Sequence, residues 1–345
     1  MQTRKHERIA TEEAYAPVKV LNEYRRLLEG GGGDRGFRSL WTYYLKNESV
    51  HTNFLVDRIQ DLGERRLADM DRLGIDRQVV GLTCPGVELF DVPLARDLAQ
   101  LTNDRIAEAC RRHPKRFVGL AAVALQDVEF SVNELHRAVN ELGLKGVIIN
   151  SHTRGEYLDD PKFEPIFAAA AELDVPLYLH PNTPSDALIG PLLDGGLDTA
   201  TFGFGVETGM HLIRIIFSGI FDKYPTLRMG VGHLGEGLPF WLFRIDHYHG
   251  VHGRTKRYPF RPDLREKPSY YLRNNIWLTT SGMAWEPAIS FTRSVVGEDR
   301  VIYAMDYPYQ VSAEEIAAQD ALPLDDKEKK YFFETGARQL FGIDA

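Results

Sequence analysis

The feature that most constrains the fold of this chain is a repeated alternation of short apolar runs with longer segments of helical periodicity. The runs are rich in Val, Ile and Leu and lie at residues 8–11, 78–82, 117–123, 146–149, 176–179, 227–231, 276–280 and 301–304. The helical segments between them include residues 62–73, 92–112, 131–142, 164–173 and 210–220. Because the runs are apolar at nearly every position, they indicate parallel strands buried under helices on both faces. Eight such runs predict an α/β fold of the (β/α)8, or TIM, barrel type.

The sequence predicts a single domain that covers residues 1–345, because no linker, repeat or low-complexity segment divides it. Two segments, residues 18–56 and 240–275, interrupt the alternation, and both follow expected strands. They predict long loops after strands 1 and 6 over the mouth of the barrel, where such loops serve as lids or subunit contacts; structural filler is the alternative. A doubly wound open sheet is the alternative fold, but no Gly-rich phosphate loop follows any expected strand.

The composition argues against several classes of function. The formal net charge of −8 and the lack of a long basic tract argue against nucleic-acid binding. No apolar run approaches the ~20 residues that span a bilayer, and the charged start MQTRKHERIA lacks the apolar core of a signal peptide. The two cysteines have no CxxC spacing, which is typical of a reducing compartment. We therefore expect a cytoplasmic protein that acts on a small molecule, without a nucleic-acid or membrane partner.

Polar side chains lie at the ends of four expected strands. Strand 1 leads into Glu12, strand 5 into His180, strand 6 into His233 and strand 8 into Asp306. In a (β/α)8 barrel, residues at the carboxyl ends of the strands converge on one pocket. We expect Glu12, His180 and Asp306 to bind one divalent metal ion, Mn²⁺ or Zn²⁺, with open positions for substrate. Taken singly, His180 could be a buried core histidine and Asp306 a helix cap; their joint placement favours the metal site.

A histidine and carboxylate pair lies beside the expected ligands. His233 precedes Glu236 by three residues, so this carboxylate could hold the imidazole in one tautomer. A charged imidazole there could polarise the substrate or relay a proton. The alternative for Glu236 is an acid in the first turn of a helix, where the helix dipole favours it. We therefore expect Asp306, His233 and Glu236 to form the catalytic group.

Four further residues are expected to contact the substrate. Arg58 and Arg244 are candidates to bind substrate carboxylates by bidentate pairing, although Arg58 could equally be a surface charge. Phe204 follows strand 5 in the segment TFGFG and could supply an aromatic wall for a planar substrate, with core packing as the alternative. Tyr309 comes shortly after Asp306 and is expected to line the pocket.

Several short motifs resemble a known family. They are ATEEA at 10–14, YLHP at 178–181, GHLGE at 232–236, RID at 244–246, TTSG at 279–282 and MDYP at 305–308. Over nearly the whole chain they resemble amidohydrolase family 2, and within it the decarboxylases of 5-carboxyvanillate, γ-resorcylate and 2,3-dihydroxybenzoate, the first being most similar. Amidohydrolases typically carry HxH on strand 1, whereas Glu12 and Ala14 stand there in this chain. The resemblance implies one metal ion rather than two, and in this family the Glu-x-Ala form accompanies non-oxidative decarboxylation.

The resemblance also implies a substrate and a mechanism. The substrate is a small phenolic acid with a hydroxyl group ortho to its carboxylate, such as 5-carboxyvanillate. The ring carbon is protonated first and CO₂ leaves afterwards, so that no free aryl anion forms. By similarity to the family Asp306 delivers the proton, which requires a raised pKa beside a cation, and His233 is the other candidate. The resemblance places Arg244 in the site of a neighbouring subunit, and we expect a homodimer or homotetramer.

Two other functions stay open at the level of sequence. A metal-dependent hydrolase of a lactone, ester or amide would use the same ligands, with Asp306 as the base. A non-catalytic barrel that binds a ligand would share the fold, but it gives no reason for polar residues at four strand ends. Release of CO₂ from ortho-hydroxybenzoates, measured beside ester and lactone substrates, distinguishes a decarboxylase from a hydrolase.

Overall fold

The computed structural model describes residues 5–344, so residues 1–4 and 345 of the expected domain, and with them the start of the charged N-terminal segment, lie outside it. Eight strands occur in the described part: β1 (Ile9–Tyr15), β2 (Arg77–Leu82), β3 (Phe117–Gly119), β4 (Val147–Asn150), β5 (Leu177–His180), β6 (Met229–Val231), β7 (Ile276–Thr279) and β8 (Val301–Ile302). All strand pairs in the ladders are parallel.

The strands form two ladders that together make a ring. One ladder has the order β1-β2-β3 and the other the order β4-β5-β6-β7-β8. A parallel bridge between Ala121 and Val147 joins the segment after β3 to β4. On the other side, the backbone N–H of Ala14 donates to the carbonyl of Tyr307 at 2.7 Å, so the segment after β8 lies beside β1. The predicted (β/α)8 barrel is therefore confirmed.

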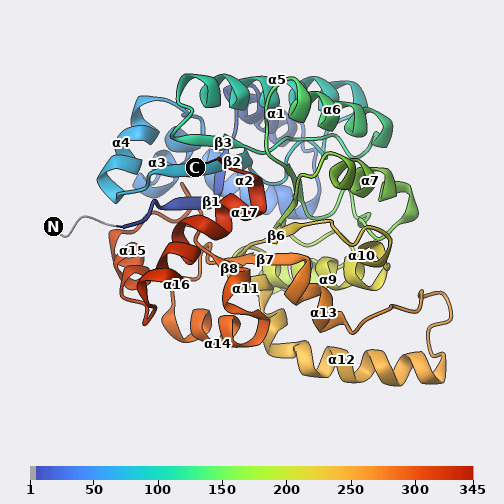
Figure 1. Ribbon diagram of the computed structural model, residues 1–345. Coiled ribbons are helices and arrows are strands. Elements are labelled where there is room, and N and C mark those ends of the chain that lie inside the picture. Colours follow the sequence, from blue (N-terminus) through green and yellow to red (C-terminus); the bar gives the residue numbers. More distant parts are fainter. Residues whose placement is uncertain (1–4, 345) are drawn as a thin grey trace.

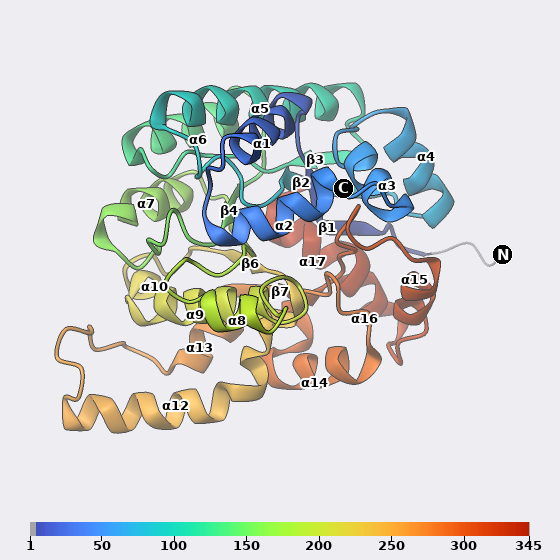
Figure 2. The same ribbon diagram turned by 180° about the vertical axis from the view of Figure 1, so that it is seen from behind.

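Helices surround the ring and cover its ends (Figures 1 and 2). They are α1 (Val18–Glu29), α2 (Arg35–Lys46), α3 (Val50–Ile59), α4 (Glu64–Leu73), α5 (Val92–Arg112), α6 (Val128–Asn140), α7 (Glu164–Glu172), α8 (Gly190–Asp194), α9 (Gly203–Phe217), α10 (Ile220–Lys223), α11 (His233–Glu236), α12 (Leu238–Thr255), α13 (Pro268–Asn274), α14 (Glu286–Val296), α15 (Ala313–Asp320), α16 (Asp326–Lys330) and α17 (Gly336–Phe341), with short turns η1 (Pro161–Phe163), η2 (Glu298–Arg300) and η3 (Tyr331–Thr335). Helix α17 lies across one end of the ring in Figure 1, and α2 lies across the other end in Figure 2.

Burial on both faces explains the nearly unbroken apolar sequence of the strands. Every residue of β4, β5 and β7 is buried. Inside the ring, the Tyr178 side chain packs against Gly230, where a β-carbon would lie 2.5 Å from the tyrosine ring. The Tyr178 ring also lies 6.4 Å from the Phe341 ring of α17. The barrel interior is thus packed between α17 and the strand ends that carry the polar residues.

The strands differ from the expected ones at several ends. Strand β1 continues to Tyr15, so Glu12 lies inside the strand rather than just after it. Strand β3 ends at Gly119 and β8 has two residues, because ladder pairing stops before the apolar runs do. These shorter ladders leave the chain near the mouth of the barrel free to follow an irregular path.

The two segments expected as long loops are mostly helical. Helices α1, α2 and α3 occupy the first, and α12 and α13 occupy most of the second. Among the residues of α12, those that are buried are Leu238, Pro239 and Leu242, all in its first turn and a half. The rest of α12 projects away from the barrel (Figure 1). These segments therefore form an added helical layer, of which α2 and the start of α12 reach the mouth.

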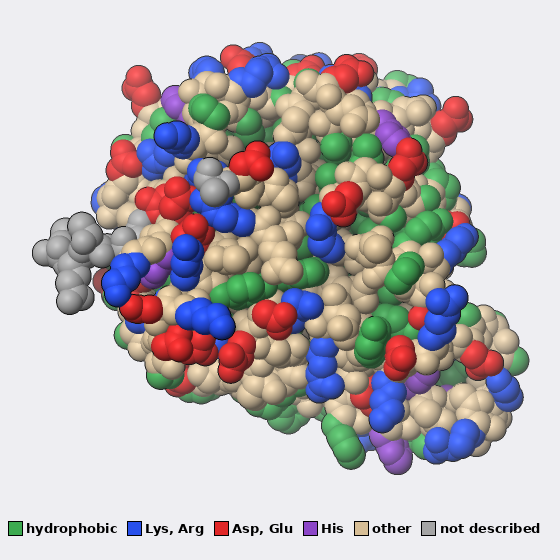
Figure 3. Space-filling view, in the orientation of Figure 1, with side chains coloured by type: hydrophobic (Ala, Val, Ile, Leu, Met, Phe, Trp, Pro, Cys, Tyr) green, Lys and Arg blue, Asp and Glu red, His purple; other side chains and the backbone are tan. Residues whose placement is uncertain are grey.

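The charged side chains on the face shown in Figure 3 are interspersed, with basic and acidic groups side by side. Within residues 5–344, none of the helices combines the length and the apolar character needed to cross a membrane.

Candidate metal centre

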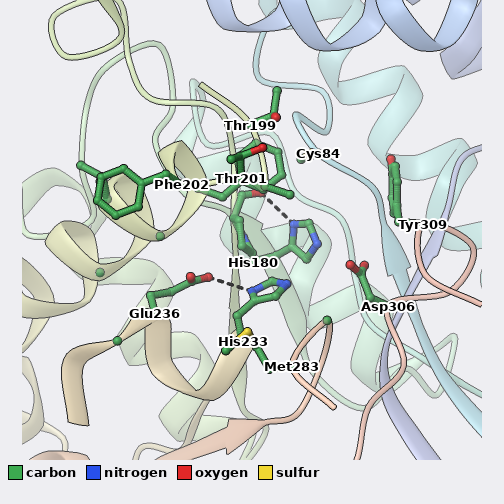
Figure 4. Close-up of a pocket in the computed structure, with 18 of the residues that line it drawn as sticks. Cys84, His180, Thr199, Thr201, Phe202, His233, Glu236, Met283, Asp306 and Tyr309 are labelled. Carbon is green, nitrogen blue, oxygen red and sulfur yellow. Dashed lines mark hydrogen bonds and ion pairs between the residues drawn. The ribbon is translucent and has the colours of Figure 1, made fainter. Parts of the chain in front are cut away.

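Glu12, His180 and Asp306 converge at one end of the barrel, as expected for residues at strand ends. Each offers one ligand atom, and these atoms lie within 4.8 Å of one another. The residues come from β1, from the end of β5 and from the segment after β8. Figure 4 shows the rings of His180 and His233 pointing toward the Asp306 carboxylate. Side chains far apart in the sequence thus form one compact group of oxygen and nitrogen donors.

The two carboxylate oxygens of Glu12 have different surroundings. Oε2 accepts hydrogen bonds from the Tyr178 hydroxyl and, at 3.2 Å, from the Thr279 hydroxyl. Oε1 is buried and has no hydrogen-bond partner in the described part of the chain. It lies 3.6 Å from Nε2 of His180 and 3.5 Å from Nε2 of His233. A buried carboxylate oxygen without a donor is costly, so this atom is suited to bind a cation.

His180 is held in the tautomer that a metal ligand needs. Its Nδ1 lies 2.8 Å from the carbonyl of Pro181, which can only accept, so Nδ1 carries the proton. The lone pair of Nε2 is then directed toward Glu12. Burial lowers the pKa of His180, which keeps the ring neutral. Both effects favour coordination through Nε2.

Asp306 is held in an unusual backbone conformation. Its φ is 72°, in the left-handed region that non-glycine residues rarely adopt. Burial raises the pKa of Asp306 to about 8, and the neighbouring carboxylate of Glu12 acts in the same direction. Gly282 lies close by, since a β-carbon there would be 3.8 Å from Oδ2 of Asp306 and 3.2 Å from the His233 ring. Backbone strain of this kind is concentrated at functional sites.

His233 and Glu236 form the pair that their spacing predicted. Nδ1 of His233 donates to Oε1 of Glu236 at 2.8 Å, so Nε2 faces the cavity (Figure 4). Although burial lowers the pKa of His233, the carboxylates of Glu236 and Glu12 outweigh it and raise this pKa to about 10. The ring is then a cationic donor at neutral pH. Residues 233–236, labelled α11 in Figure 1, and the following Gly237 do not form a right-handed helix, because their φ values are all positive.

Helix α9 allows the pair to lie close to it because it presents glycines there. A β-carbon at Gly205 would lie 3.3 Å from Oε2 of Glu236, and one at Gly209 would lie 3.3 Å from the Glu236 carbonyl. Larger side chains at these positions would push the turn away from the helix. Gly205 and Gly209 of the TFGFGVETG segment therefore allow the close approach of this turn.

His180 and Asp306 of this cluster, together with His233 and Glu236, line a cavity of about 910 Å³. Its aromatic wall consists of Tyr43, Tyr44, Phe202, Phe204, Trp241 and Tyr309. Among the described residues that line it, none is Lys or Arg. Such a cavity is suited to a planar aromatic ring, whereas a carboxylate in it must be neutralised by a metal ion, by His233 or by a group from outside this chain.

The structure brings some of the expected substrate contacts to the cavity and not others. Phe204 and Tyr309 line it. The Arg58 guanidinium instead binds the Asp69 carboxylate at 2.8 Å and lies over the Phe54 ring, and it is not among the lining residues. The side chain of Arg58 is thus engaged within the helical layer, with the Asp69 carboxylate and the Phe54 ring, and its role as a substrate contact stays a prediction.

Arg244 also lies outside the cavity of its own chain. It is exposed on α12, with its guanidinium 5.3 Å from the centre of the Tyr248 ring. It is not among the residues that line the cavity of its own chain.

Tyr178 and Thr279 are site residues that were not predicted from the sequence. Tyr178 precedes His180 by two residues, and alternate residues of a strand point to the same face. Once His180 is assigned to the barrel interior, this alternation predicts that Tyr178 points inward too. The same alternation could have identified Thr279 at the end of β7. However, β7 contains no metal-binding residue type from which the inward-facing positions could be assigned.

The donor set fits a divalent cation. It combines carboxylate oxygens with a neutral imidazole nitrogen, as Mn²⁺ and Zn²⁺ prefer. The unpartnered Oε1 of Glu12 and the free Nε2 of His180 face the same point. The three residues therefore satisfy the requirements of a mononuclear site with room left for substrate.

Comparisons with known proteins agree with this geometry. Residues 49–343 match a family model described as amidohydrolase. The crystal structure of 5-carboxyvanillate decarboxylase from Novosphingobium aromaticivorans, complexed with manganese and 4-hydroxy-3-methoxy-5-nitrobenzoic acid, is 50% identical, with a TM-score of 0.97 over 99% of this chain and 98% of that chain. The 5-carboxyvanillate decarboxylase of Sphingomonas paucimobilis is 35% identical, with a TM-score of 0.92 over 98% and 99% of the two chains. A γ-resorcylate decarboxylase of Rhodococcus jostii is 32% identical over 98% of this chain and 99% of its own.

Proposed function

We propose that this chain, which belongs to the amidohydrolase family, is a metal-dependent carboxy-lyase of phenolic aromatic acids. Its substrate class is an aromatic acid with a hydroxyl group ortho to the carboxylate, such as 5-carboxyvanillate. The observation that carries the proposal is the cluster of Glu12, His180 and Asp306, of which His180 and Asp306 line an aromatic cavity. A similar solved structure that contains manganese and a nitro-substituted benzoic acid supports it.

Glu12, His180 and Asp306 are the proposed ligands of one divalent cation. Mn²⁺ is the first choice because relatives of known structure contain manganese, and Zn²⁺ is the alternative. When bound, the cation would supply the positive charge that favours an ionised phenol and offsets the carboxylates of the site. The ligand assignment is supported by the free Oε1 of Glu12 and by the Nδ1 tautomer of His180.

The walls of the cavity hold and shield the substrate ring. Phe204 and Tyr309 line the cavity and offer flat faces to a planar substrate. The Tyr309 hydroxyl is fixed by a 2.5 Å hydrogen bond with the Thr83 hydroxyl, so its ring has a set orientation. Correct placement of the ring carbon near a proton donor supplies much of the rate enhancement in reactions of this kind.

Asp306 is the proposed donor of the proton to the ring carbon that carries the carboxylate. Its raised pKa of about 8 lets the carboxyl hold a proton near neutral pH. The new C–H bond takes its electron pair from the phenolate ring. Cleavage of the bond to the carboxylate returns an electron pair to the ring, CO₂ leaves, and Asp306 regains a proton from water. Because a bound cation lowers the pKa of the same carboxyl, the ligand and donor roles of Asp306 oppose each other, and His233 is the alternative donor.

His233 is proposed to stabilise negative charge on the substrate. The Nδ1–H of His233 donates to Glu236, so Nε2 faces the cavity and carries a second N–H when the ring is cationic. A cationic ring beside the cluster would donate a hydrogen bond to a phenolate or carboxylate oxygen as the ring is protonated. Glu236 acts through His233 and is therefore a positioning residue.

We also propose that the chain forms a homodimer or homotetramer in which Arg244 of each protomer enters the cavity of a neighbour. The cavity lacks a lysine or arginine among the described residues, so the second carboxylate of a dicarboxylic substrate needs a cation from elsewhere. Large apolar side chains are exposed on the same helix as Arg244, including Phe240, Trp241 and Phe243, the last at 86%. Apolar surface of this extent is typical of subunit interfaces.

Mixing of two inactive variants tests the shared site. Arg244→Ala and His233→Asn chains would each be inactive alone, and mixed oligomers would recover part of the activity if Arg244 works across the interface. Arg58→Ala is the matched control, and we expect it to keep activity because Arg58 lies outside the cavity. A monomer in light scattering would exclude the assembly.

The free state of Cys84 and Cys110 supports a reducing compartment, and we propose that the protein is located in the cytoplasm.

The decisive assay measures CO₂ release and the loss of ultraviolet absorbance with 5-carboxyvanillate and a panel of ortho-hydroxybenzoates. Ester and lactone substrates are measured beside them. We expect CO₂ from at least one phenolic acid, loss of turnover after chelation and recovery with Mn²⁺. Turnover of esters or lactones without CO₂ from any phenolic acid would replace the decarboxylase with a hydrolase. No turnover of either class would reject both.

A further inference from the structure

The side of the barrel where β8 meets β1 is closed largely by side chains. Among residues 5–344, each ladder ends at this seam, with β1 at the end of one and β8 at the end of the other. The Thr11 hydroxyl donates to the Tyr303 carbonyl at 2.7 Å, and the N–H of Ala14 donates to the Tyr307 carbonyl at 2.7 Å. The backbone N–H groups of Met305 and Tyr307, which face the seam, need further acceptors because they are buried.

Glu13 supplies both acceptors. Its Oε1 accepts the N–H of Met305 at 3.1 Å, and its Oε2 accepts the N–H of Tyr307 at 3.0 Å. The side chain is 2% exposed, so water does not compete for these bonds. Asp306 is the residue between the two bonded N–H groups. One carboxylate therefore holds the peptide group that follows the proposed metal ligand and the peptide group that precedes Met305, so it fixes the backbone on both sides of Asp306.

Asp306 needs such support because its φ of 72° is one that side chains larger than glycine rarely adopt. A conformation of this kind persists only where surrounding contacts fix it. The orientation of the Asp306 side chain depends directly on this φ, so a relaxed backbone would turn the carboxylate away from Glu12 and His180.

Glu13 is itself held in place from the other side. The pairing of β1 with β2 shifts register between Ala10 and Glu13, so neighbouring side chains there do not alternate as in a regular strand. Nε2 of Gln78 lies 3.4 Å from Oε2 of Glu13, and Oε1 of Gln78 accepts from the buried Arg66 at 3.2 Å. Arg66 also donates to the carbonyl of Ala14 at 2.6 Å. This chain of contacts aims the Glu13 carboxylate along the seam.

We propose that Glu13 is a positioning residue that holds Asp306 in the geometry of the metal cluster. Adjacent residues of β1 then have different tasks: Glu12 offers an oxygen to the metal, and Glu13 fixes the backbone that presents the opposite ligand. The inference rests on the proposed function only for the role of Asp306 in the site.

Glu13→Gln is the direct test, because glutamine has the same shape but one acceptor oxygen in place of two. Its amide NH₂ would face one of the two backbone N–H groups, donor against donor. We expect a folded protein by circular dichroism, a dissociation constant for Mn²⁺ raised by roughly 10-fold or more, and a kcat lowered with little change in KM. Mn²⁺ binding is measured without substrate, from the free-ion signal in electron paramagnetic resonance. It therefore reports on Glu13 even if the chain proves not to be a decarboxylase.

Glu134→Gln is the matched control. Glu134 is a 2% exposed carboxylate of α6 that binds Asn103 and Arg137, far from the cavity in the sequence and in the fold. We expect it to lose thermal stability while Mn²⁺ binding stays unchanged. If Glu13→Gln behaves in the same way, with wild-type Mn²⁺ affinity and kcat, the proposal is overturned and Glu13 is structural only.

A double-mutant comparison shows whether Glu13 acts through Asp306. In an Asp306→Asn background, Glu13→Gln is expected to change Mn²⁺ affinity by less than about 2-fold, because the ligand that it positions is already altered. An effect as large as in the wild-type background would overturn the proposal. If Glu13→Gln does not fold, Glu13→Asp is measured instead, because aspartate keeps both carboxylate oxygens on a side chain that is one carbon shorter. We expect this variant to bind Mn²⁺ more weakly. Unchanged Mn²⁺ binding would count equally against the proposal.

Discussion

The carboxylate of Glu12 illustrates how single side chains prepare this site. Oε2 is occupied by hydroxyl donors of Tyr178 and Thr279, which themselves lie 3.0 Å apart. Oε1 is left without a donor in the described part of the chain and faces His180 and His233. Hydrogen bonds to one oxygen fix the carboxylate plane and leave the other oxygen for the metal, which is how outer residues commonly orient metal ligands.

Tyr178→Phe is expected to weaken Mn²⁺ binding by roughly 10-fold to 100-fold, because Glu12 loses a donor and gains rotational freedom. Calorimetric titration of the metal-free protein with Mn²⁺ measures the effect. Tyr157→Phe is the control, since Tyr157 is also a buried tyrosine. Its hydroxyl donates to the Glu207 carboxylate at a distance of 3.2 Å and lies away from the metal cluster. Equal Mn²⁺ affinity in the wild type and in Tyr178→Phe would show that this hydroxyl does not orient the ligand.

The two cysteines are expected to be unreactive in the native protein. Burial raises the pKa of Cys84 and of Cys110 to about 12. A raised pKa keeps a thiol protonated, so at pH 8 only about one in ten thousand would be thiolate, the reactive form. Alkylation with iodoacetamide, followed by mass spectrometry, should label neither residue in the folded protein within minutes and both after unfolding. Rapid labelling of Cys84 in the folded state would show that the wall of the cavity opens.

At the scale of residues, the sequence predicts ligands better than their supports. Glu12, His180 and Asp306 could be found because metal-binding residue types seldom gather at several strand ends of one barrel unless they share a site. The role of Glu13 could not, because it depends on the register shift in β1 and on contact with a segment about 290 residues later. Arg58 was a candidate only by residue type, and its ion pair with Asp69 is invisible in the sequence.

Among the elements, the turn after β6 carries the most conformational strain. Residues 233–237 all have positive φ, so the chain makes a left-handed turn there. L residues avoid this conformation, at a cost of about 1–2 kcal/mol for each. The turn places His233 and Glu236 on the same side, where their hydrogen bond forms. Glycines at 235 and 237 reduce the strain at the positions that carry no functional side chain.

Gly235→Ala is expected to destabilise this turn and lower activity. Its φ is 75°, and a β-carbon would lie 3.0 Å from the Leu278 side chain, so backbone strain and overpacking together cost about 2–5 kcal/mol. Gly250→Ala in the middle of α12 is the control. There a β-carbon meets only the end of the Arg254 side chain at 3.4 Å, and alanine should stabilise the helix by about 0.5–1 kcal/mol. Urea unfolding of both variants measures the difference, and equal stability would mean that the turn is not strained.

The same turn explains why α9 begins earlier than the sequence predicts. The periodicity predicts a helix from residue 210, whereas α9 begins at Gly203. Glycines weaken the helical pattern of residues 203–209, yet Gly205 and Gly209 are required because the turn packs against them. The helices of the two insertions were likewise expected as loops, since their amphipathic pattern is short and broken by Gly and aromatic residues. Sequence patterns thus identify the repeating barrel units well and the added layer poorly.

For the whole molecule, the number of strands and their parallel order follow from the alternation alone, but the closure of the ring does not. The expected eighth strand had four residues, and the ladder holds two of them. The seam is instead closed by the side chains of Thr11 and Glu13 and by the N–H of Ala14. Closure by side chains produces no periodic pattern in the sequence, so it is visible only in the folded structure.

This closure gives the metal a role in the stability of the whole barrel. Its proposed ligands come from β1 in one ladder, and from β5 and the segment after β8 on the side of the other, so a bound ion links both ladders near the seam. A ligand that binds only the folded state at 100 times its dissociation constant stabilises it by about 2.7 kcal/mol. With an unfolding entropy of about 2.1 cal/mol/K per residue, a chain of 345 residues should gain about 4 °C in Tm.

Scanning calorimetry of the protein after chelation, and again with added Mn²⁺, measures this shift. Glu12→Gln is the control and should show a much smaller response, because its side chain offers a weaker ligand at the same place. Chelation without any change in Tm, in a protein that binds Mn²⁺ in titration, would mean that the unfolded chain binds the ion as well as the folded one does. In that case the ion serves the reaction alone, and the side chains of the seam hold the ladders together without it.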